Sequence, residues 1–392
     1  LPSVGAGVNN MISITLPSRS FLRVPAVDPV LILAVATLLS LSMVMVFSAA
    51  IGTHGGVQGG FVILVKHSFS IVLALFLGFV AASVPLRFWR QANRPLLGLS
   101  TVLLVLVLIP GIGHEVNGST RWLPLGLMRF QPSELVKVVT VLFLADHFVR
   151  NSESMDSFRI SILEPAFVIG MLGVLLLLEP DLGCTAVIMM TSVGLMYLSG
   201  TRIRYIFGAI VVAVCAVAVL IIVEPYRLQR VLSFRDPWAD PFDTGFQLVQ
   251  ALIALGSGEW FGVGLGASVQ KLFYLPHASN DFIVAVIGEE LGLIGLVALL
   301  VLYGLMLWRI FDIASRAADA GEMFGARVCQ GIGLLVVLQA IFHFAVNLGL
   351  VPTKGLTLPL MSYGGSSMLI NGLALGIVLS VYQCLPQRSK GR

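Results

Sequence analysis

The stretch YLPHASNDFIVAVIGEELGLIG begins with turn residues and an acidic residue, Asp281, and then becomes apolar. A carboxylate held close to a reacting hydroxyl can take its proton as a general base. Asp281 is therefore our candidate catalytic residue. The alternative is an ordinary helix N-cap, because aspartate is a preferred residue directly before a helix.

The same stretch carries two adjacent carboxylates, Glu289 and Glu290, inside its apolar run. If one helix continues from Asp281, a rise of about 1.5 Å per residue places them about 12 Å deeper than Asp281 and pointing about 100° apart. Ionisable groups inside an apolar span are costly and mark either a functional cavity or a paired charge. We expect one of them to pair with a group such as Lys66 or to line a polar channel.

The motif QPSELVKVV places another charged pair, Glu134 and Lys137, three residues apart. Helical residues at i and i+3 are neighbours, so the two side chains can face each other. The motif predicts either a functional pair that faces a cavity or a structural ion pair.

Glycines and serines near the C-terminus form a candidate anion site in the motif SYGGSSM. The glycines break the chain, and the serines open a helix whose first N–H groups and positive dipole end attract anions. The alternative is a glycine turn with serine capping. The candidate binding residues of this motif are Ser362, Gly364, Gly365, Ser366 and Ser367.

Basic side chains can complete this anion site. The spans that begin near residues 133, 282 and 366 all start on the same side, so three positive helix ends are expected to converge there. An anionic substrate is implied. The basic residues expected at this place are Arg121, Arg129, Lys137 and Lys354.

The composition indicates a polytopic membrane protein. Hydrophobic residues make up 57% of the chain and charged residues 11%, against about half and about a quarter in a soluble domain. The net charge of +4 is too small and too evenly spread to indicate nucleic acid binding. The four cysteines form no CxxC pair, so we interpret them as packing thiols and predict no zinc site.

Ten apolar stretches are long enough to cross a bilayer as helices, which predicts an all-α fold. Placing both termini in the cytoplasm puts most of the 24 Lys and Arg residues on that side, in agreement with the positive-inside rule. The predicted spans are residues 29–51, 61–84, 95–112, 133–149, 160–179, 183–199, 206–223, 282–308, 329–350 and 366–385.

We divide the chain into three parts. Residues 1–28 form a cytoplasmic segment without a signal-peptide pattern, residues 29–385 a single transmembrane domain, and residues 386–392 a cytoplasmic tail.

The long or motif-rich connections fall on the outer side of the membrane, at residues 113–132, 224–281 and 351–365. The functional machinery is therefore expected on that face. In the longest connection, residues 246–255 show one apolar helical face near several aromatic residues, which is typical of a helix lying at the membrane interface.

Five motifs in order along the chain resemble the SEDS (shape, elongation, division, sporulation) family of bacterial membrane glycosyltransferases. They are NGSTRW with QPSELVK, EPDLG, DPWADPFDTGFQLVQALIALGSGEWFGVGLG, YLPHASNDFIVAVIGEELG and PTKGLTLPLMSYGGSS. The wording of DPWAD and GSGEWFGVGLG is similar to the division branch more than to the elongation branch. The likeness covers residues 29–385.

This resemblance implies that the chain polymerises lipid II into peptidoglycan strands on the outer face of the cytoplasmic membrane, at the division septum. It implies a class B penicillin-binding transpeptidase as partner, together with other division proteins. In the family, the aspartate of the motif HASNDF is the one implicated in catalysis, and Asp281 occupies that position. Many relatives have an acidic residue and a threonine near it where this chain reads HASND.

The chemistry of lipid II fits the residues above. Its pyrophosphate leaves as a stable anion and needs positive charge rather than a general acid, whereas the acceptor hydroxyl needs a base. A divalent cation, Mg²⁺ or Mn²⁺, is a candidate helper, and no organic cofactor is expected.

Two other functions stay open at this point. Ten helices with intramembrane charges also suit a lipid II flippase, although transport needs polar groups through the full depth and the motifs here cluster on one face. A non-catalytic division scaffold would leave the cluster of outer motifs unexplained.

Overall fold

The computed structural model of the protein describes residues 27–385 except 54–55, 117–118, 127, 224–228, 230–232, 244 and 273–274. The described chain is mostly helical, and a helix overlaps every stretch that the sequence assigned to a span. These helices are α1 (Pro29–Thr53), α2 (Val57–Ser83), α3 (Leu86–Leu108), α4 (Pro132–Arg150), α5 (Glu164–Leu178), α6 (Leu182–Leu198), α7 (Ile203–Val223), α10 (Ile283–Asp319), α11 (Met323–Asn347) and α12 (Gly365–Gln383).

Within the described residues, eight helices are long and apolar enough to cross a membrane, which confirms the class of helical membrane protein. Helices α4 and α6 are not among the eight. Helix α6 has only 17 residues, and α4 carries ionisable side chains near both of its ends.

Large apolar side chains on several helices face outward, which suits a lipid surroundings. Phe167 on α5, Phe207 on α7 and Val72 on α2 are each exposed by more than 60%. Many serine, threonine, asparagine and charged side chains are buried instead. This is the arrangement expected where the solvent is hydrocarbon and polar groups find partners only inside the protein.

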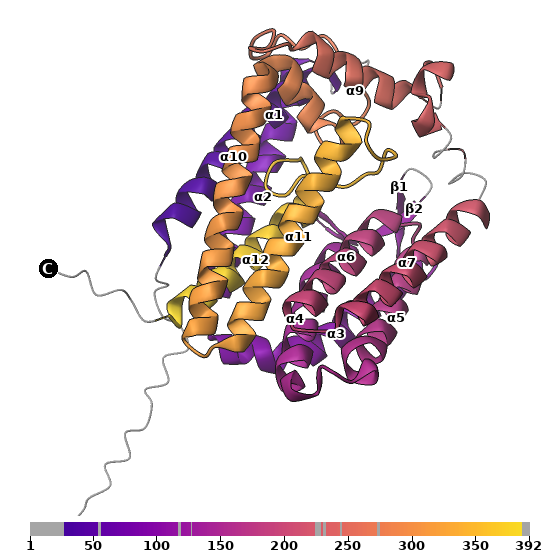
Figure 1. Ribbon diagram of the computed structural model, residues 1–392. Helices are drawn as coiled ribbons and strands as arrows, with labels where there is room; N and C mark the ends of the chain where they lie inside the picture. The colour runs from indigo at the N-terminus through magenta and orange to yellow at the C-terminus, as the bar shows by residue number, and fades with distance from the viewer. Residues whose placement is uncertain are drawn as a thin grey trace, which may run out of the picture.

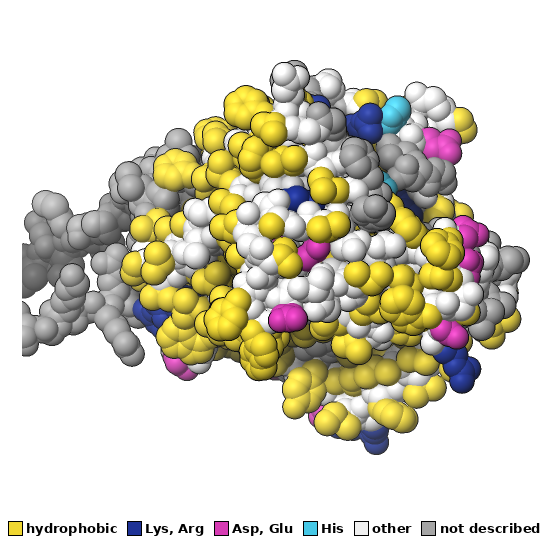
Figure 2. Space-filling model, turned by 90° about the horizontal axis from the view of Figure 1, so that it is seen from above, with side chains coloured by type: hydrophobic (Ala, Val, Ile, Leu, Met, Phe, Trp, Pro, Cys, Tyr) yellow, Lys and Arg dark blue, Asp and Glu magenta, His cyan; other side chains and the backbone are white. Residues whose placement is uncertain are grey.

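Helix α9 (Phe246–Ser257) lies at one end of the helix bundle, which we call the α9 end (Figure 1). It confirms the helix predicted over 246–255. Trp238, Phe242, Trp260 and Phe261 in the same segment are largely exposed. Seen from above, this end shows hydrophobic side chains interspersed with charged ones (Figure 2), a pattern suited to a membrane interface.

A small antiparallel sheet occupies the connection between α3 and α4, where the sequence predicted only a loop. Strands β1 (His114–Val116), β2 (Ser119–Leu125) and β3 (Met128–Phe130) pair in sequential order. Two of the strands have three residues, too few to show the period-two alternation by which strands are recognised. The all-α expectation therefore holds for the bundle and not for this connection.

Helix α10 is broken near its start, at Gly292, whereas the sequence predicted one continuous helix. Gly292 has a φ of +67°, and a Cβ there would lie 2.4 Å from the backbone nitrogen of Gly262. Backbone hydrogen bonds join this break to residues 259–263. The N–H of Val263 donates to Glu289 O and that of Leu293 to Glu259 O, both at 2.9 Å. Only glycine allows this backbone shape and this close approach.

Helices α2 and α12 pack through small residues at positions 74, 78, 372 and 376. A Cβ on Gly372 would lie 2.3 Å from Ala74 O, and one on Gly376 would lie 2.3 Å from Gly78 O. The spacing of Gly372 and Gly376 gives the GxxxG pattern that allows helix backbones to approach closely in membranes.

Replacing Gly372 by alanine should therefore destabilise the bundle by about 1–3 kcal/mol, the usual cost of overpacking a close contact. Gly304→Ala on α10 is the matched control, because a Cβ there meets nothing within 4 Å. Thermal unfolding of both variants in detergent would check this. Equal midpoints for the two variants would show that the α2 and α12 backbones are not in close contact.

Candidate functional site

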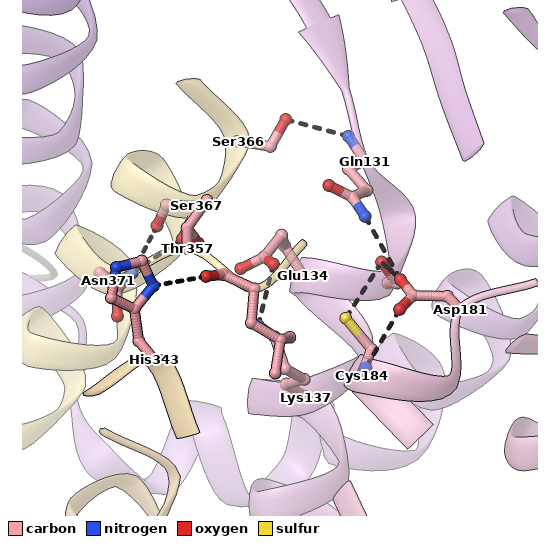
Figure 3. A network of polar contacts seen from close by, with 12 residues as sticks. Gln131, Glu134, Lys137, Asp181, Cys184, His343, Thr357, Ser366, Ser367 and Asn371 are labelled. Atoms are coloured by element: carbon pink, nitrogen blue, oxygen red, sulfur yellow. Dashed lines mark hydrogen bonds and ion pairs between the residues drawn. The ribbon is translucent and has the colours of Figure 1, made fainter. Parts of the chain in front are cut away.

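Polar side chains from separate helices meet around the starts of α4, α6 and α12 (Figure 3). Ser366 ties two of these starts together. Its hydroxyl donates to Arg129 O and accepts from the N–H of Gln131, both at 2.9 Å. The start of α12 is thereby fixed against the junction of β3 and α4.

Ser367 binds the chain that leads into α12. Thr357 Oγ1 donates to Ser367 Oγ at 2.8 Å, and Asn371 Nδ2 donates to the same hydroxyl at 3.2 Å. Helix α12 begins after Gly364 without a side-chain cap among the described residues, so the serines do not act as its N-cap. The helix start keeps the geometry of an anion site, and its role as one stays a prediction.

Glu134 and Lys137 face each other on α4, as their spacing predicted. Lys137 Nζ lies 2.9 Å from Glu134 Oε1, and both side chains are buried. The positive charge of Lys137 is therefore balanced inside the protein, which weakens its contribution to a site for an anionic ligand. Next to this pair, Asp181 caps α6 by accepting the N–H of Cys184 at 3.1 Å.

Arg121 on β2 binds the turn between α5 and α6. Its Nε donates to Glu179 O at 2.8 Å and its Nη2 to Pro180 O at 2.7 Å. Pro180 has a φ of +33°, an unusual value in this turn. Arg121 therefore anchors an irregular backbone, and Arg129, whose side chain is exposed, lies on the neighbouring strand β3.

Asp281 lies half-buried in a turn that precedes α10. Its N–H donates to His277 O at 3.0 Å, and Asn347 Nδ2 from α11 donates to Asp281 O at 3.1 Å. The N-cap position of α10 belongs to Phe282, and Asn347 Oδ1 accepts the N–H of Ala285 at 3.0 Å. The capping alternative for Asp281 is thus not what the structure shows.

The connection between α11 and α12 runs directly beside this turn. A Cβ on Gly355 would lie 3.2 Å from Asp281 Oδ2, which brings Lys354 and Asp281 into one neighbourhood. Ser362 Oγ donates to Asn280 O at 2.6 Å. Ser362, which was predicted to bind a ligand, therefore uses its hydroxyl to hold the turn that precedes Asp281.

Glu290 forms a buried ion pair with Lys271, not with Lys66 as the sequence suggested. Lys271 Nζ lies 2.7 Å from Glu290 Oε1, and Ser48 Oγ donates to the same oxygen at 2.6 Å. Lys66 is exposed on α2. No local pattern points to Lys271, because it lies in the long connection and only the fold brings it to Glu290.

The neighbouring carboxylate, that of Glu289, binds the same connection between α9 and α10. It accepts the N–H of Val269 at 2.9 Å and the hydroxyl of Ser268. The two glutamates thus fasten residues 262–271 onto the short helix that precedes Gly292. Their role in this structure is to satisfy charge and backbone, which answers why an apolar stretch carries two acids.

The predicted depth order of Asp281 and the glutamates is wrong. Lys271 lies against the C-terminal end of α1, where it also binds Ser48, at 2.8 Å. Met361 accepts from Ser42, which is six residues, or about 9 Å, farther from that end of α1. Ser362, the residue after Met361, binds Asn280, so the Asp281 turn lies near the level of Ser42. Glu290 lies at the level of Ser48, closer to the C-terminal end of α1. The break at Gly292 reverses the short helix 283–291 against the rest of α10.

A cleft of about 320 Å³ lies between the start of α9 and the two segments that flank Asp281 and Lys354. This volume is in the range of small-molecule sites, and its lining mixes aromatic and polar side chains. The lining residues are Gln229, Ser233, Phe234, Asp243, Gly245, Phe246, Gln247, Leu248, Pro276 and Thr353.

Metal binding by the protein alone finds no support in the described part of the chain. No group of three or more His, Cys, Asp or Glu side chains is placed there to hold an ion. The described residues therefore do not fit a resident metal ion.

Glu179, which follows α5, was missed as a candidate in the sequence. Its side chain is fully buried, and neither carboxyl oxygen has a hydrogen-bond partner among the described residues. Burial raises the pKa of Glu179 to about 8, nearby Asp181 adds to the rise, and Arg121 opposes it. The carboxyl is therefore largely protonated at neutral pH.

The chain belongs to the FtsW/RodA/SpoVE family of cell cycle proteins, which its residues 29–385 match. The probable peptidoglycan glycosyltransferase FtsW of Nitrosomonas europaea is 46% identical over 360 residues, covering 91% of this chain and 93% of the relative. That of Thioalkalivibrio sulfidiphilus is 47% identical over 354 residues, covering 90% and 88%. The resemblance seen in the sequence is confirmed.

Solved structures are similar over the same length. A chain of a peptidoglycan synthase complex that coordinates polymerization and crosslinking has a TM-score of 0.75 and 32% identity, covering 92% of this chain and 99% of that one. The rod shape determining protein RodA of Thermus thermophilus has a TM-score of 0.68 and 30% identity, covering 92% and 98%.

The buried Glu179 carboxyl should make stability depend on pH. Its folded pKa of about 8 exceeds the ordinary value of 4.5, so the folded state keeps a proton that the unfolded chain releases. This contribution is complete below about pH 4.5 and is lost as pH rises through about 8. Glu179→Gln should therefore lose fewer degrees of melting temperature than the parent between about pH 6 and about pH 9.

Thermal unfolding in detergent at the two pH values measures this difference. Glu153→Gln, at an exposed position, is the control and should behave as the parent does. The same loss in all three proteins would mean that Glu179 ionises normally in the folded state.

Proposed function

We propose that this chain is a lipid II polymerase of the division branch, which builds peptidoglycan strands on the outer face of the cytoplasmic membrane at the septum. The observation that supports it most is the half-buried Asp281 turn, which lies against the segment of Lys354. Relatives named as peptidoglycan glycosyltransferases cover about nine-tenths of the chain and support the same activity.

In this proposal ten helices cross the membrane, α4 and α6 included, and both termini are cytoplasmic. The α9 end is then the outer face, with residues 224–281 as its long loop. The basic residues at the starts of α3 and α7 and within α10, among them Arg87, Arg90, Arg204 and Arg309, fall on the cytoplasmic side, which agrees with the positive-inside rule. Residues 1–28 and 386–392 are the two cytoplasmic ends. Of these, only residues 27–28 belong to the described part of the chain.

Asp281 acts as the general base in a single displacement. Its carboxylate takes the proton of the acceptor hydroxyl as that oxygen attacks the anomeric carbon, and the bond to pyrophosphate breaks on the opposite side. The configuration of that carbon is inverted. Because His277 O and the Asn347 side chain bind the backbone of Asp281, the position of this residue is set before substrate arrives.

Positive charge around the start of α12 receives the leaving pyrophosphate. Lys354, Arg121 and the first N–H groups of α12 stabilise the charge that develops on it. Lys137 contributes less than its charge suggests, since Glu134 neutralises it. If Mg²⁺ or Mn²⁺ takes part, the pyrophosphate oxygens themselves must supply ligands, as they do at many Mg²⁺ sites.

The partners in this proposal are a class B penicillin-binding transpeptidase, which crosslinks the new strand, and other division proteins. Purified protein with its cognate transpeptidase and labelled lipid II separates the alternatives. Strand products support the polymerase, and movement of lipid II across vesicles supports a flippase. The absence of both results supports a scaffold.

Asp281→Asn is the sharpest test of the mechanism. Asparagine keeps the size of the side chain and leaves the backbone bonds of the turn in place, but it cannot take a proton. We expect strand formation from labelled lipid II to fall about 10²- to 10⁴-fold, the scale for removing a general base, while thermal stability and lipid II binding persist.

Asp319→Asn provides the control, because Asp319 is exposed at the opposite end of the same helix. It should polymerise at the parental rate. Near-parental strand formation by Asp281→Asn would move the base to another carboxyl.

Removal of the positive charge of Lys354 should also slow strand formation. Lys354→Ala takes one charge from a site that must accept a pyrophosphate, and a loss on the order of 10²-fold in strand formation is expected. Lys66→Ala is the matched control, since Lys66 is exposed on α2. Parental rates in Lys354→Ala would place the leaving-group site elsewhere.

A further inference from the structure

Residues 358–363 of the connection between α11 and α12 lie inside the helix bundle rather than on its surface. Leu358, Leu360 and Met361 are almost completely buried. Two hydroxyls from other helices bind the carbonyls of this segment. Ser42 Oγ on α1 donates to Met361 O at 2.7 Å, and the hydroxyl of Tyr303 on α10 donates to Pro359 O.

Ser42 is itself oriented by a buried histidine. His67 Nε2 on α2 lies 2.7 Å from Ser42 Oγ. A serine hydroxyl has one proton, which Ser42 gives to Met361 O, so it must accept from His67. Nε2 therefore carries the imidazole proton, and Nδ1 is an unprotonated acceptor in the neutral ring.

His67 Nδ1 has no hydrogen-bond partner among the described residues, although the side chain is fully buried. Such an unsatisfied buried atom is rare in folded proteins and calls for an explanation. Within the described part of the chain, the His67 side chain hydrogen-bonds to Ser42 alone, and its ring packs near that of Tyr363, with centroids 5.9 Å apart. Both contacts lead to the segment 361–363.

The other side of the same segment binds the Asp281 turn. The N–H of Tyr363 donates to Ser279 O at 2.9 Å, and Ser362 Oγ donates to Asn280 O at 2.6 Å. Three consecutive residues thus join α1 and α2 on one side to the backbone directly before Asp281 on the other.

We propose that Ser42 and His67 are positioning residues for Asp281, acting through residues 361–363; this inference rests on the proposed function. A serine that served only its own helix would bond within that helix, as Ser40 does to Ala36 O at 2.8 Å. Ser42 instead directs its hydroxyl to the segment that fixes the depth of the Asp281 turn.

The test compares Ser42→Ala with Ser40→Ala, two serine hydroxyls on the same helix. Ser42→Ala should lower kcat for strand formation on the order of 10- to 100-fold, the effect of a small misplacement of a catalytic group, with KM for lipid II unchanged. Backbone hydrogen exchange at residues 277–281 and 358–363 should increase, and exchange elsewhere should not. Ser40→Ala should match the parent in every measurement.

A second pair of variants separates hydrogen bonding from packing. His67→Gln keeps an N–H donor toward Ser42 and should retain much of the parental kcat. His67→Leu has no such donor and should lower kcat as Ser42→Ala does. Parental exchange at residues 277–281 in both Ser42→Ala and His67→Leu would overturn the inference, as would parental kcat. If the parent itself forms no strands, the proposed function fails, and the exchange measurement still decides whether Ser42 and His67 hold the turn.

Discussion

Backbone that leaves helical geometry inside an apolar bundle must find its hydrogen-bond partners within the protein, because hydrocarbon offers none. The buried connection between α11 and α12 meets this requirement through side chains of other helices. Ser42, Tyr303 and His343 bind carbonyls of Met361, Pro359 and Leu356. Much of the polar content of these apolar helices is therefore explained by the irregular backbone that it supports, and that backbone in turn holds the Asp281 turn.

The helices could be predicted because each depends on its own composition. About twenty apolar residues in sequence leave no alternative in a membrane, so all ten predicted stretches contain helix. The break in α10 could not be predicted in the same way. Gly292 stands in a run that is otherwise apolar and helical, and the reason for its backbone shape is Gly262, which only the fold brings to it.

In the candidate site, too, contacts between residues close in sequence could be predicted, whereas contacts made by the fold could not. Glu134 and Lys137 are three residues apart, so their contact follows from helix geometry alone. Glu290 finds Lys271 and Ser48 from distant parts of the chain, and no local pattern announces either partner. The raised pKa of Glu179 depends on complete burial, a property of the packed turn rather than of the motif EPDLG.

The acids of the opening motif differ in what holds them in place. Glu289 and Glu290 are fixed through their carboxylates, which bind serine, lysine and backbone N–H groups, so their charge is used in joining two segments. The position of Asp281 is set by bonds of its backbone to His277 and Asn347. A chemical change at the Asp281 carboxylate therefore leaves these anchoring bonds in place, whereas the same change at Glu290 removes a support of the fold. Under the proposed function, this fixed backbone sets the position of Asp281 before substrate binds.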